Sequence, residues 1–202
     1  MFRRPRRDSA VAAEEQPADF YDRTFEEAAH WKRPYYESHY YPLWCVVADR
    51  IRLGKVRSVL DLGCGPGQLA RLLADNGLER YVGVDFSSKR IEAARQVCPE
   101  YAFYAADFFE TDLFSTLDYD CVLAMEVLEH IHEDARLLGR IAPGTRFIGS
   151  VPNFPARAHV RYFQTAEEVR QRYGSQFSAL RVDTIRGMTA GKLFFLLDGT
   201  TL

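Results

Sequence analysis

Three glycines at alternate positions follow a short apolar run, and an acid lies within that run. The run covers residues 59–62, the acid is Asp61, and the glycines are Gly63, Gly65 and Gly67. Glycine lets the backbone adopt positive φ and lets a ligand approach closely, because it has no Cβ. An apolar pattern of helical spacing follows the glycines. The stretch therefore predicts a buried strand, a tight turn and a helix, the unit with which parallel sheets bind nucleotides.

A second acid, Asp85, ends the apolar segment 81–85, which we interpret as another buried strand. An acid at the tip of the second strand accepts hydrogen bonds from the ribose hydroxyls of a nucleoside. Its charge disfavours a ligand that carries a 2′-phosphate. In the alternative interpretation Asp85 only caps the following helix. Together with the glycine turn, this acid predicts a cofactor that contains a nucleoside.

The glycine spacing separates the classes of nucleotide-binding turn. It is G-x-G-x-G, whereas the dinucleotide fingerprint is G-x-G-x-x-G and would need its third glycine at the position of Gln68. The phosphate-binding Walker loop, G-x-x-x-x-G-K-[ST], is also absent from the sequence. The remaining alternative is that the glycines form a tight turn and nothing more.

Residues 59–67, V-L-D-L-G-C-G-P-G, resemble the first motif of the class I S-adenosylmethionine (SAM)-dependent methyltransferases. The run E-V-L-E-H at 126–130 resembles the fourth motif of the ubiquinone-biosynthesis O-methyltransferases in that class. The resemblance covers residues 56–151, where strand and helix patterns alternate as in a parallel sheet. It implies an α/β, Rossmann-like, doubly wound fold with a seven-stranded, mostly parallel sheet whose last strand is antiparallel. It also implies SAM as cofactor and S-adenosylhomocysteine (SAH) as product.

The resemblance further implies which residues bind the cofactor. Asp107 would meet the adenine amino group, and Phe108 would lie against the adenine ring. The amino group is a hydrogen-bond donor, so a carboxylate acceptor suits it. The expected cofactor-binding residues are Asp61, Gly63, Cys64, Gly65, Gly67, Gln68, Asp85, Phe86, Asp107, Phe108, Glu126 and Val127.

The E-V-L-E-H run offers three side chains with possible chemical roles. In some relatives, including small-RNA 2′-O-methyltransferases, the corresponding residues bind a divalent metal; here they would be Glu126, Glu129 and His130, with His132 nearby. The spacing puts them on one helical face, and mixed carboxylate and imidazole ligands suit such an ion. We do not favour a metal, because many metal-free methyltransferases share the run. We expect His130 to be catalytic as a general base; otherwise it orders the turn.

Residues 19–53 form the most aromatic part of the chain. The family usually has a lid over SAM in this place, and aromatic faces suit a sulfonium because it is a cation. We expect Tyr36 and His39 to be catalytic, and Tyr35 and Tyr40 to contact the substrate. In the alternative interpretation the aromatic side chains pack a helix at 42–53 onto the sheet.

A polar loop follows the fifth expected strand, residues 146–151. It starts with the rigid run P-N-F-P at 152–155 and lies at the same edge of the sheet as the glycine turn. We predict that its polar groups face the methyl group and select the substrate, although solvation of a loop would explain each of them singly. The residues are Asn153, His159, Arg161 and Tyr162.

The chain has 202 residues, 47% of them apolar, and a net charge of −2. This composition suits one globular domain. It shows no excess of basic residues that would indicate binding to nucleic acid or a membrane. The 4 cysteines lack C-x-x-C spacing and indicate free thiols in a reducing compartment. No apolar run reaches the roughly 18 residues of a membrane span, and we expect no secretory signal. We therefore expect a cytoplasmic enzyme, either a monomer or a homodimer.

We expect a disordered tail at 1–18 and a single domain at 19–202. In that domain, residues 19–55 would form a helical lid, 56–151 the cofactor-binding core, and 152–202 the substrate loop and closing strands. The tail is rich in arginine, so an arm that binds RNA is the alternative interpretation.

Methyl transfer from a sulfonium is an in-line displacement in which the cofactor brings the electrophile. The protein therefore mainly supplies position and a dry site. We predict a SAM-dependent methyltransferase that acts on a small-molecule acceptor, with oxygen preferred over nitrogen. The alternatives are an RNA methyltransferase, which would need the arginine-rich tail, a non-catalytic SAM-binding module, and a nicotinamide oxidoreductase, which would need the other glycine spacing.

Overall fold

The computed structural model describes residues 14–202. Within these residues the strands are β1 (Ser58–Leu62), β2 (Arg80–Asp85), β3 (Ala102–Ala105), β4 (Cys121–Met125), β5 (Arg146–Pro152), β6 (Phe177–Arg186) and β7 (Leu193–Thr201). The α-helices are α1 (Ala18–Glu27), α2 (Tyr41–Leu53), α3 (Gln68–Asp75), α4 (Ser88–Val97), α5 (Leu113–Thr116), α6 (Asp134–Leu138) and α7 (Ala166–Tyr173). Short 3-10 turns are η1 (Ala29–Lys32), η2 (Tyr35–Glu37), η3 (Leu128–His130) and η4 (Gly174–Gln176).

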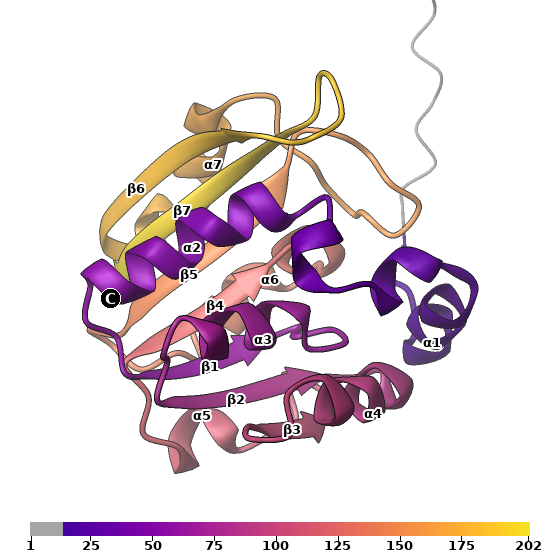
Figure 1. Cartoon of the computed structure of the whole chain (residues 1–202). Coiled ribbons are helices and arrows are strands. Elements are labelled where there is room, and N and C mark those ends of the chain that lie inside the picture. The colour runs from indigo at the N-terminus through magenta and orange to yellow at the C-terminus, as the bar shows by residue number, and fades with distance from the viewer. Residues whose placement is uncertain (1–13) are drawn as a thin grey trace, which may run out of the picture.

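The described strands form one sheet in the order β3-β2-β1-β4-β5-β7-β6 (Figure 1). The pairs from β3 across to β5 are parallel, and β7 lies antiparallel between β5 and β6. The prediction of a seven-stranded, mostly parallel, doubly wound sheet with an antiparallel last strand is confirmed. The predicted tail at 1–18 lies mainly in residues 1–13, outside the described part, and α1 begins at Ala18.

Alternate residues of β1 enter two different cores, because successive side chains of a strand point to opposite faces. Val59 belongs to the core under α2, α3 and α4, the first two of which lie in front of the sheet in Figure 1. Leu60 and Leu62 belong to the core under α5, α6 and α7. Strands buried on both faces explain the continuous apolar runs in this part of the sequence.

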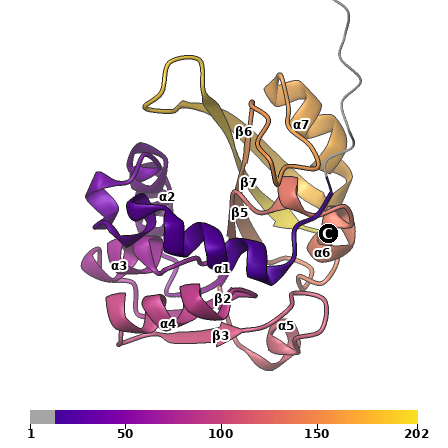
Figure 2. The ribbon, with the colours of Figure 1, turned by 90° about the vertical axis from the view of Figure 1, so that its right-hand side faces the viewer.

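The chain leaves β1 toward β2 on one side, and later returns to β4 on the other side. This reversal of strand order opens a crevice at the carboxyl ends of the strands, where open α/β sheets bind their ligands. Figure 2 looks onto that edge and shows α1 lying across it, above α4. No helix of the described residues is long and apolar enough to cross a membrane.

Candidate functional site

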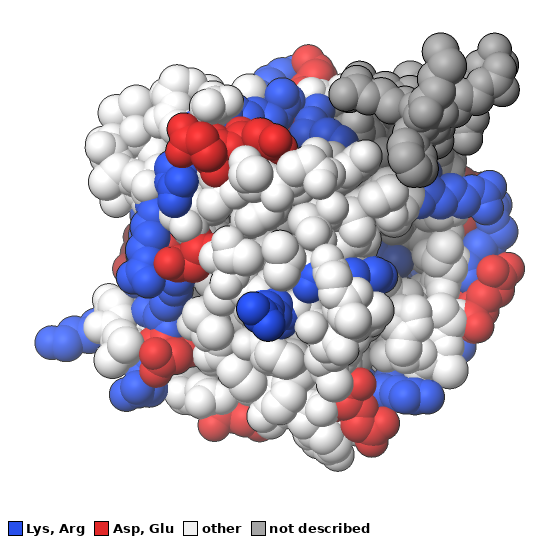
Figure 3. All heavy atoms as spheres, turned by 90° about the horizontal axis from the view of Figure 1, so that it is seen from above, with Lys and Arg blue, Asp and Glu red and all other residues white. Residues whose placement is uncertain are grey.

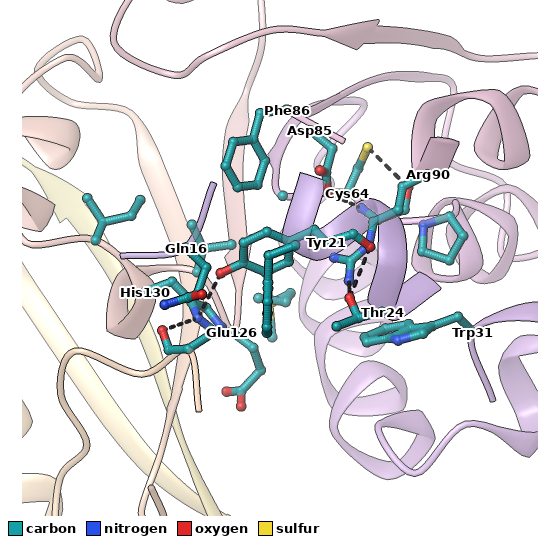
Figure 4. A pocket seen from close by; sticks show the side chains of 18 of the residues that line it. Gln16, Tyr21, Thr24, Trp31, Cys64, Asp85, Phe86, Arg90, Glu126 and His130 are labelled. Carbon is teal, nitrogen blue, oxygen red and sulfur yellow. Dashed lines mark hydrogen bonds between the residues drawn. The ribbon is translucent and has the colours of Figure 1, made fainter. Parts of the chain in front are cut away.

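A cavity of about 550 Å³ lies at the carboxyl edge of the parallel strands. Its floor is the glycine turn after β1 and the residues that follow β2, β3 and β4, and its cover is α1. Of the expected cofactor-binding residues, all except Gly67 line it. The side chains in Figure 4 show that Tyr21 of α1 projects between its two ends, with Asp85 and Arg90 on one side and Glu126 and His130 on the other.

The glycine turn has two distinct parts. Gly65 has φ +55°, and a Cβ added there would meet no atom within 4 Å, so this backbone is open to a ligand. Gly67 has φ +82°, and a Cβ there would come within 2.9 Å of the Cα of Ala94 in α4. Gly67 therefore positions the helix beside the cavity, whereas Gly65 faces the cavity itself.

Asp85 is only 3% exposed at the end of β2. Its carboxylate accepts hydrogen bonds from the backbone N–H groups of Gly65, at 3.0 Å, and Ser87, at 2.9 Å. Burial raises the pKa of Asp85, and the guanidinium of Arg90 opposes that rise. The acid is therefore fixed against the glycine turn with its charge close to a cation.

Two further acids border the same end of the cavity. Asp61 is buried in β1, accepts a hydrogen bond from the hydroxyl of Tyr81, and has an Oδ1 with no partner among the described residues. Burial raises the pKa of Asp61 to about 7. Asp107 is exposed, and its Oδ1 accepts a hydrogen bond from the backbone N–H of Phe109 at 2.7 Å. An unpartnered buried oxygen and an exposed carboxylate both leave acceptors for a ligand.

The cover of the cavity is fixed to the core at two points. The ring of Tyr21 packs against Phe86 with 5.0 Å between centroids, and its hydroxyl lies 3.2 Å from Nδ1 of His130. Asp22 accepts hydrogen bonds from the Ser87 hydroxyl and the Lys89 backbone N–H of α4. These contacts close the cavity from the side where α1 crosses the sheet edge.

The predicted lid residues divide into two groups. Tyr40 lines the cavity. Tyr35, Tyr36 and His39 do not: Tyr35 donates to Asp75 of α3 at 3.0 Å, Tyr36 is 59% exposed, and the ring of His39 packs on Tyr40. The 3-10 turn η2 places Tyr35 and Tyr36 away from the cavity, while α1 supplies the cover.

Carboxylate and imidazole groups gather at the other end of the cavity. Glu126 has φ +56° and accepts a hydrogen bond from Ser150 Oγ at 2.8 Å. Burial raises the pKa of Glu126 to about 8. Glu129 is 0% exposed, neither carboxylate oxygen has a hydrogen-bond partner among the described residues, and Oε1 lies 3.8 Å from Nε2 of His130. Burial raises the pKa of Glu129 well above its usual range, and Glu126 adds to that rise.

His130 and His159 complete this cluster. Nδ1 of His130 lies 2.8 Å from the carbonyl oxygen of Ala158, and a carbonyl only accepts, so we assign the proton to Nδ1 and the lone pair to Nε2. Burial lowers the pKa of His130 to about 4, and His159 contributes to the lowering. Ligand atoms of Glu129, His130 and His159 all lie within 4.8 Å of one another. The donor set and the unpartnered Glu129 oxygens fit a divalent cation of the borderline class.

The other predicted substrate residues have internal partners. The guanidinium of Arg161 donates to the carbonyl oxygens of Leu128, Ile131 and His132 and pairs with Asp134 at 2.9 Å. Asn153 accepts from the Leu193 N–H at 2.7 Å and donates to Gly191. Tyr162 is exposed. Of this group only His159 lines the cavity, and the others are outside its lining.

Comparison with known proteins identifies one family. A family profile described as "Methyltransferase domain" matches residues 59–145. The ubiquinone biosynthesis O-methyltransferase of Thiobacillus denitrificans (strain ATCC 25259 / T1) is 30% identical over 164 residues, which cover 72% of this chain and 68% of that protein.

The chain belongs to the class I SAM-dependent methyltransferases. This membership confirms the predicted family, the enzyme class and SAM as cofactor. It also sets aside the nicotinamide oxidoreductase alternative.

Other relatives of the methyltransferase match shorter stretches or only the fold. The trans-aconitate 2-methyltransferase of Azoarcus sp. (strain BH72) is 33% identical over 90 residues, 44% of this chain and 35% of that protein. The chain therefore spans about a third of the length of that relative. The crystal structure of magnesium protoporphyrin IX methyltransferase (ChlM) from Synechocystis PCC 6803 with bound SAM has a TM-score of 0.68 at 20% identity, covering 96% of this chain and 100% of that one. At that identity the likeness shows a shared fold.

The cavity of the methyltransferase fits SAM on this structure's own evidence. Gly65 leaves open the space that a side chain would fill. Asp85 offers a fixed acceptor at the tip of β2, and the aromatic rings of Tyr21 and Phe86 border the same space. An acceptor for ribose hydroxyls and aromatic faces for a sulfonium cation are the groups that an adenosyl sulfonium needs.

Some cavity residues were not expected from the sequence. They come mainly from α1, η1, α4 and the loop after β5, and they include Phe20, Tyr21, Thr24, Trp31, Arg90 and Arg157. The aromatic richness of residues 19–53 is the one signal that pointed to this region. Nothing in the spacing of α4 singles out Arg90, because arginine on a helix usually faces solvent.

Proposed function

We propose that this methyltransferase transfers the methyl group of SAM to a small-molecule acceptor, with oxygen preferred over nitrogen as the accepting atom. The observation that carries the proposal is one covered cavity with the cofactor-type acids at one end and a neutral imidazole at the other. Its volume, about 550 Å³, lies within the roughly 300–1,000 Å³ of small-molecule sites. A covered site of this size supports a small acceptor rather than a polymer.

The residues of the site would have the following roles. Asp85 would hold the ribose hydroxyls, and the cover formed by α1 would exclude water. SAM supplies the electrophilic methyl group. The Nε2 lone pair of His130 would take the proton of an acceptor hydroxyl as the oxygen attacks, which is the role of a general base. The low pKa of His130 keeps its imidazole neutral near pH 7 and therefore able to accept. A neutral amine acceptor would not need this base before attack.

The proposal is tested by SAH formation with pairs of hydroxy and amino compounds that share one ring or chain. We expect turnover with hydroxy members at a higher rate than with their amino partners. Turnover of the amino members alone would overturn the oxygen preference. SAM binding without turnover across a broad panel would favour a non-catalytic SAM-binding module.

Replacing Asp85 by alanine should weaken SAM binding by about 1–3 kcal/mol, because hydrogen bonds to a charged group are lost. That corresponds to a roughly 5–150-fold rise in Kd by isothermal titration calorimetry. Asp118→Ala, which removes an acid from an exposed position outside the cavity, is the matched control and should leave Kd unchanged. An unaltered Kd for Asp85→Ala would remove this residue from the cofactor site.

A metal-assisted form of the same reaction is a second candidate, favoured by the buried, unpartnered carboxylate of Glu129. A divalent ion held by Glu129, His130 and His159 would supply Lewis-acid chemistry next to the acceptor. The Nε2 lone pair of His130 would then bind the ion and would not act as the base.

Equilibrium dialysis against Mn²⁺ or Zn²⁺ tests this candidate. If the cluster is a metal site, the protein should bind about one ion, and His159→Ala should weaken that binding at least roughly tenfold, because even loss of an outer-shell partner has an effect of this size. His132→Ala changes an exposed histidine of the same segment and should have no effect. Equal metal binding by the wild type and both variants would place the ion elsewhere.

The surface gives less support to an RNA methyltransferase. On the face seen in Figure 3, the Lys and Arg side chains of the described residues are interspersed with acids around the rim, and only a few of them lie in the mostly uncharged middle. A protein that neutralises several phosphates needs a continuous basic surface. The arginines of the predicted RNA-binding arm lie outside the described residues.

A further inference from the structure

Arg90 has an unusual environment for a helical arginine. It lies in the first turn of α4, is 9% exposed, and lines the cavity. Its guanidinium carbon is 5.1 Å from the ring centroid of Tyr21 and 4.8 Å from that of Trp31 (Figure 4). Two aromatic rings from the cover therefore hold this cation in place by cation–π contacts.

The hydrogen-bonding capacity of Arg90 is largely unused. One terminal nitrogen donates to Thr24 Oγ1 at 3.3 Å, and its buried Nε has no partner among the described residues. A guanidinium carries five donors, so several of them are free for a ligand. A buried donor without a partner costs free energy, which a bound acceptor would recover.

The charge of Arg90 has Asp85 nearby but no direct ion-pair partner in the described part of the chain. No carboxylate of the described residues forms an ion pair with it, and the nearby Asp85 already accepts from two backbone N–H groups. Taking a cation out of water costs several kcal/mol unless an anion or other partner offsets it. The other arginine of the cavity, Arg157, is exposed and packs on Phe20. The cavity is therefore built to receive a negative group beside Arg90.

The position of Arg90 indicates where that negative group comes from. Arg90 shares an end of the cavity with Cys64 and Asp85, and Tyr21 separates it from His130 and Glu126, where an acceptor would react (Figure 4). The nucleoside part of SAM is uncharged, and its methionine part carries one carboxylate. A carboxylate matches the planar fork of a guanidinium.

We propose that Arg90 binds the methionine carboxylate of SAM. The inference rests on the proposed SAM-dependent function. Because Tyr21 and Trp31 stack on the same guanidinium, the carboxylate also gains a contact that orders the cover over the cofactor. Arg90 is a binding residue in this assignment and takes no part in the transfer of the methyl group.

Decarboxylated SAM tests the assignment, because it keeps the amine and sulfonium and lacks only the carboxylate. Calorimetry with both ligands should show that Arg90→Met raises the Kd of SAM about 10–100-fold, the range for charged hydrogen bonds. The Kd of decarboxylated SAM should change by less than about threefold. Arg90→Lys keeps the charge without the fork and should give an intermediate loss for SAM.

Arg95→Met is the matched control, because it removes a cation of the same helix that donates to the Phe103 carbonyl, away from the cavity. The ratio of the two Kd values should be unchanged in this variant. Equal losses for both ligands in Arg90→Met, or none for SAM, would overturn the assignment. A wild-type protein that binds neither ligand would instead contradict the proposed function.

Discussion

Replacing Asp134 by alanine is expected to lower the free energy of unfolding by about 3–5 kcal/mol, the cost of removing one partner from a buried ion pair. Asp134 is 1% exposed, and its carboxylate accepts hydrogen bonds from Arg172, at 2.6 and 2.8 Å, and from the hydroxyl of Tyr173, at 2.8 Å. It also pairs with Arg161 at 2.9 Å. Alanine would leave the guanidinium of Arg172 and the buried hydroxyl of Tyr173 without this acceptor, and Arg161 without its carboxylate partner.

Urea denaturation measures this loss, and Glu133→Ala is its control. Glu133 is the exposed neighbour of Asp134 just before α6, and it pairs with Arg136 of that helix. That exposed pair should contribute no more than about 0.5 kcal/mol. A loss below about 1 kcal/mol for Asp134→Ala would show that water replaces the carboxylate, against the burial described.

The Asp134 network also bears on the site. Arg161 connects Asp134 to the carbonyl oxygens of Leu128, Ile131 and His132, which belong to the segment that carries His130. Once Asp134 is removed, Arg161 has one fewer anchor, so the histidine cluster should become less well ordered. Catalysis depends on such positioning even when the altered residue does not touch the substrate.

Replacing Gly67 by alanine is expected to cost about 2–5 kcal/mol of stability, because two penalties combine. A left-handed backbone costs a non-glycine residue roughly 1–2 kcal/mol, and overpacking costs about 1–3 kcal/mol. The added Cβ would lie 2.9 Å from the Cα and 3.1 Å from the Cβ of Ala94. Since the contact is with the backbone of α4, the helix has to move, and the affinity for SAM should fall about tenfold or more.

Gly77 provides a matched control for this prediction. It has the same φ of +82°, but a Cβ there would meet nothing within 4 Å. Gly77→Ala should therefore cost only the backbone penalty, roughly 1–2 kcal/mol, and should leave SAM binding unchanged. Equal losses of stability in the two variants would mean that α4 does not need the close approach of Gly67.

The cofactor end of the site could be predicted from the sequence because it follows from strand order. Asp61, Asp85 and Asp107 each lie in or just after an apolar strand segment, and parallel strands end at the same edge. Once the strands were recognised, the acids had to meet. The glycine turn added the direction of the chain and the class of nucleotide.

The cover could not be predicted in the same way. Helix α1 has aromatic side chains but no fully buried residue, and its sequence does not say which part of the sheet edge it covers. The tyrosines at 35 and 36 are as aromatic as Tyr21, yet the turn η2 directs them away from the cavity. Which aromatic residue covers a ligand depends on the path of the connecting segment, and short-range patterns do not contain that information.

Long-range partners explain the remaining differences. Arg161 has the polarity of a substrate residue, but carbonyl groups about thirty positions earlier in the chain use its donors. His159 joins His130 because the loop after β5 folds back along that same segment. Arg90 is buried by rings of α1 and η1, which precede it by about sixty residues or more. Only the folded structure shows such pairings.

At Glu126 a strained backbone lowers the stability of the protein but keeps a carboxylate in the cavity. Its φ of +56° is held by a backbone bond to Ser150 and by the Ser150 hydroxyl, and this conformation costs a residue with a side chain roughly 1–3 kcal/mol. Glycine would relax there without penalty but would bring no carboxylate to the cavity. A selection for thermostable variants would therefore favour glycine at this position. The selected protein would lack one of the carboxylates at the reactive end of the cavity.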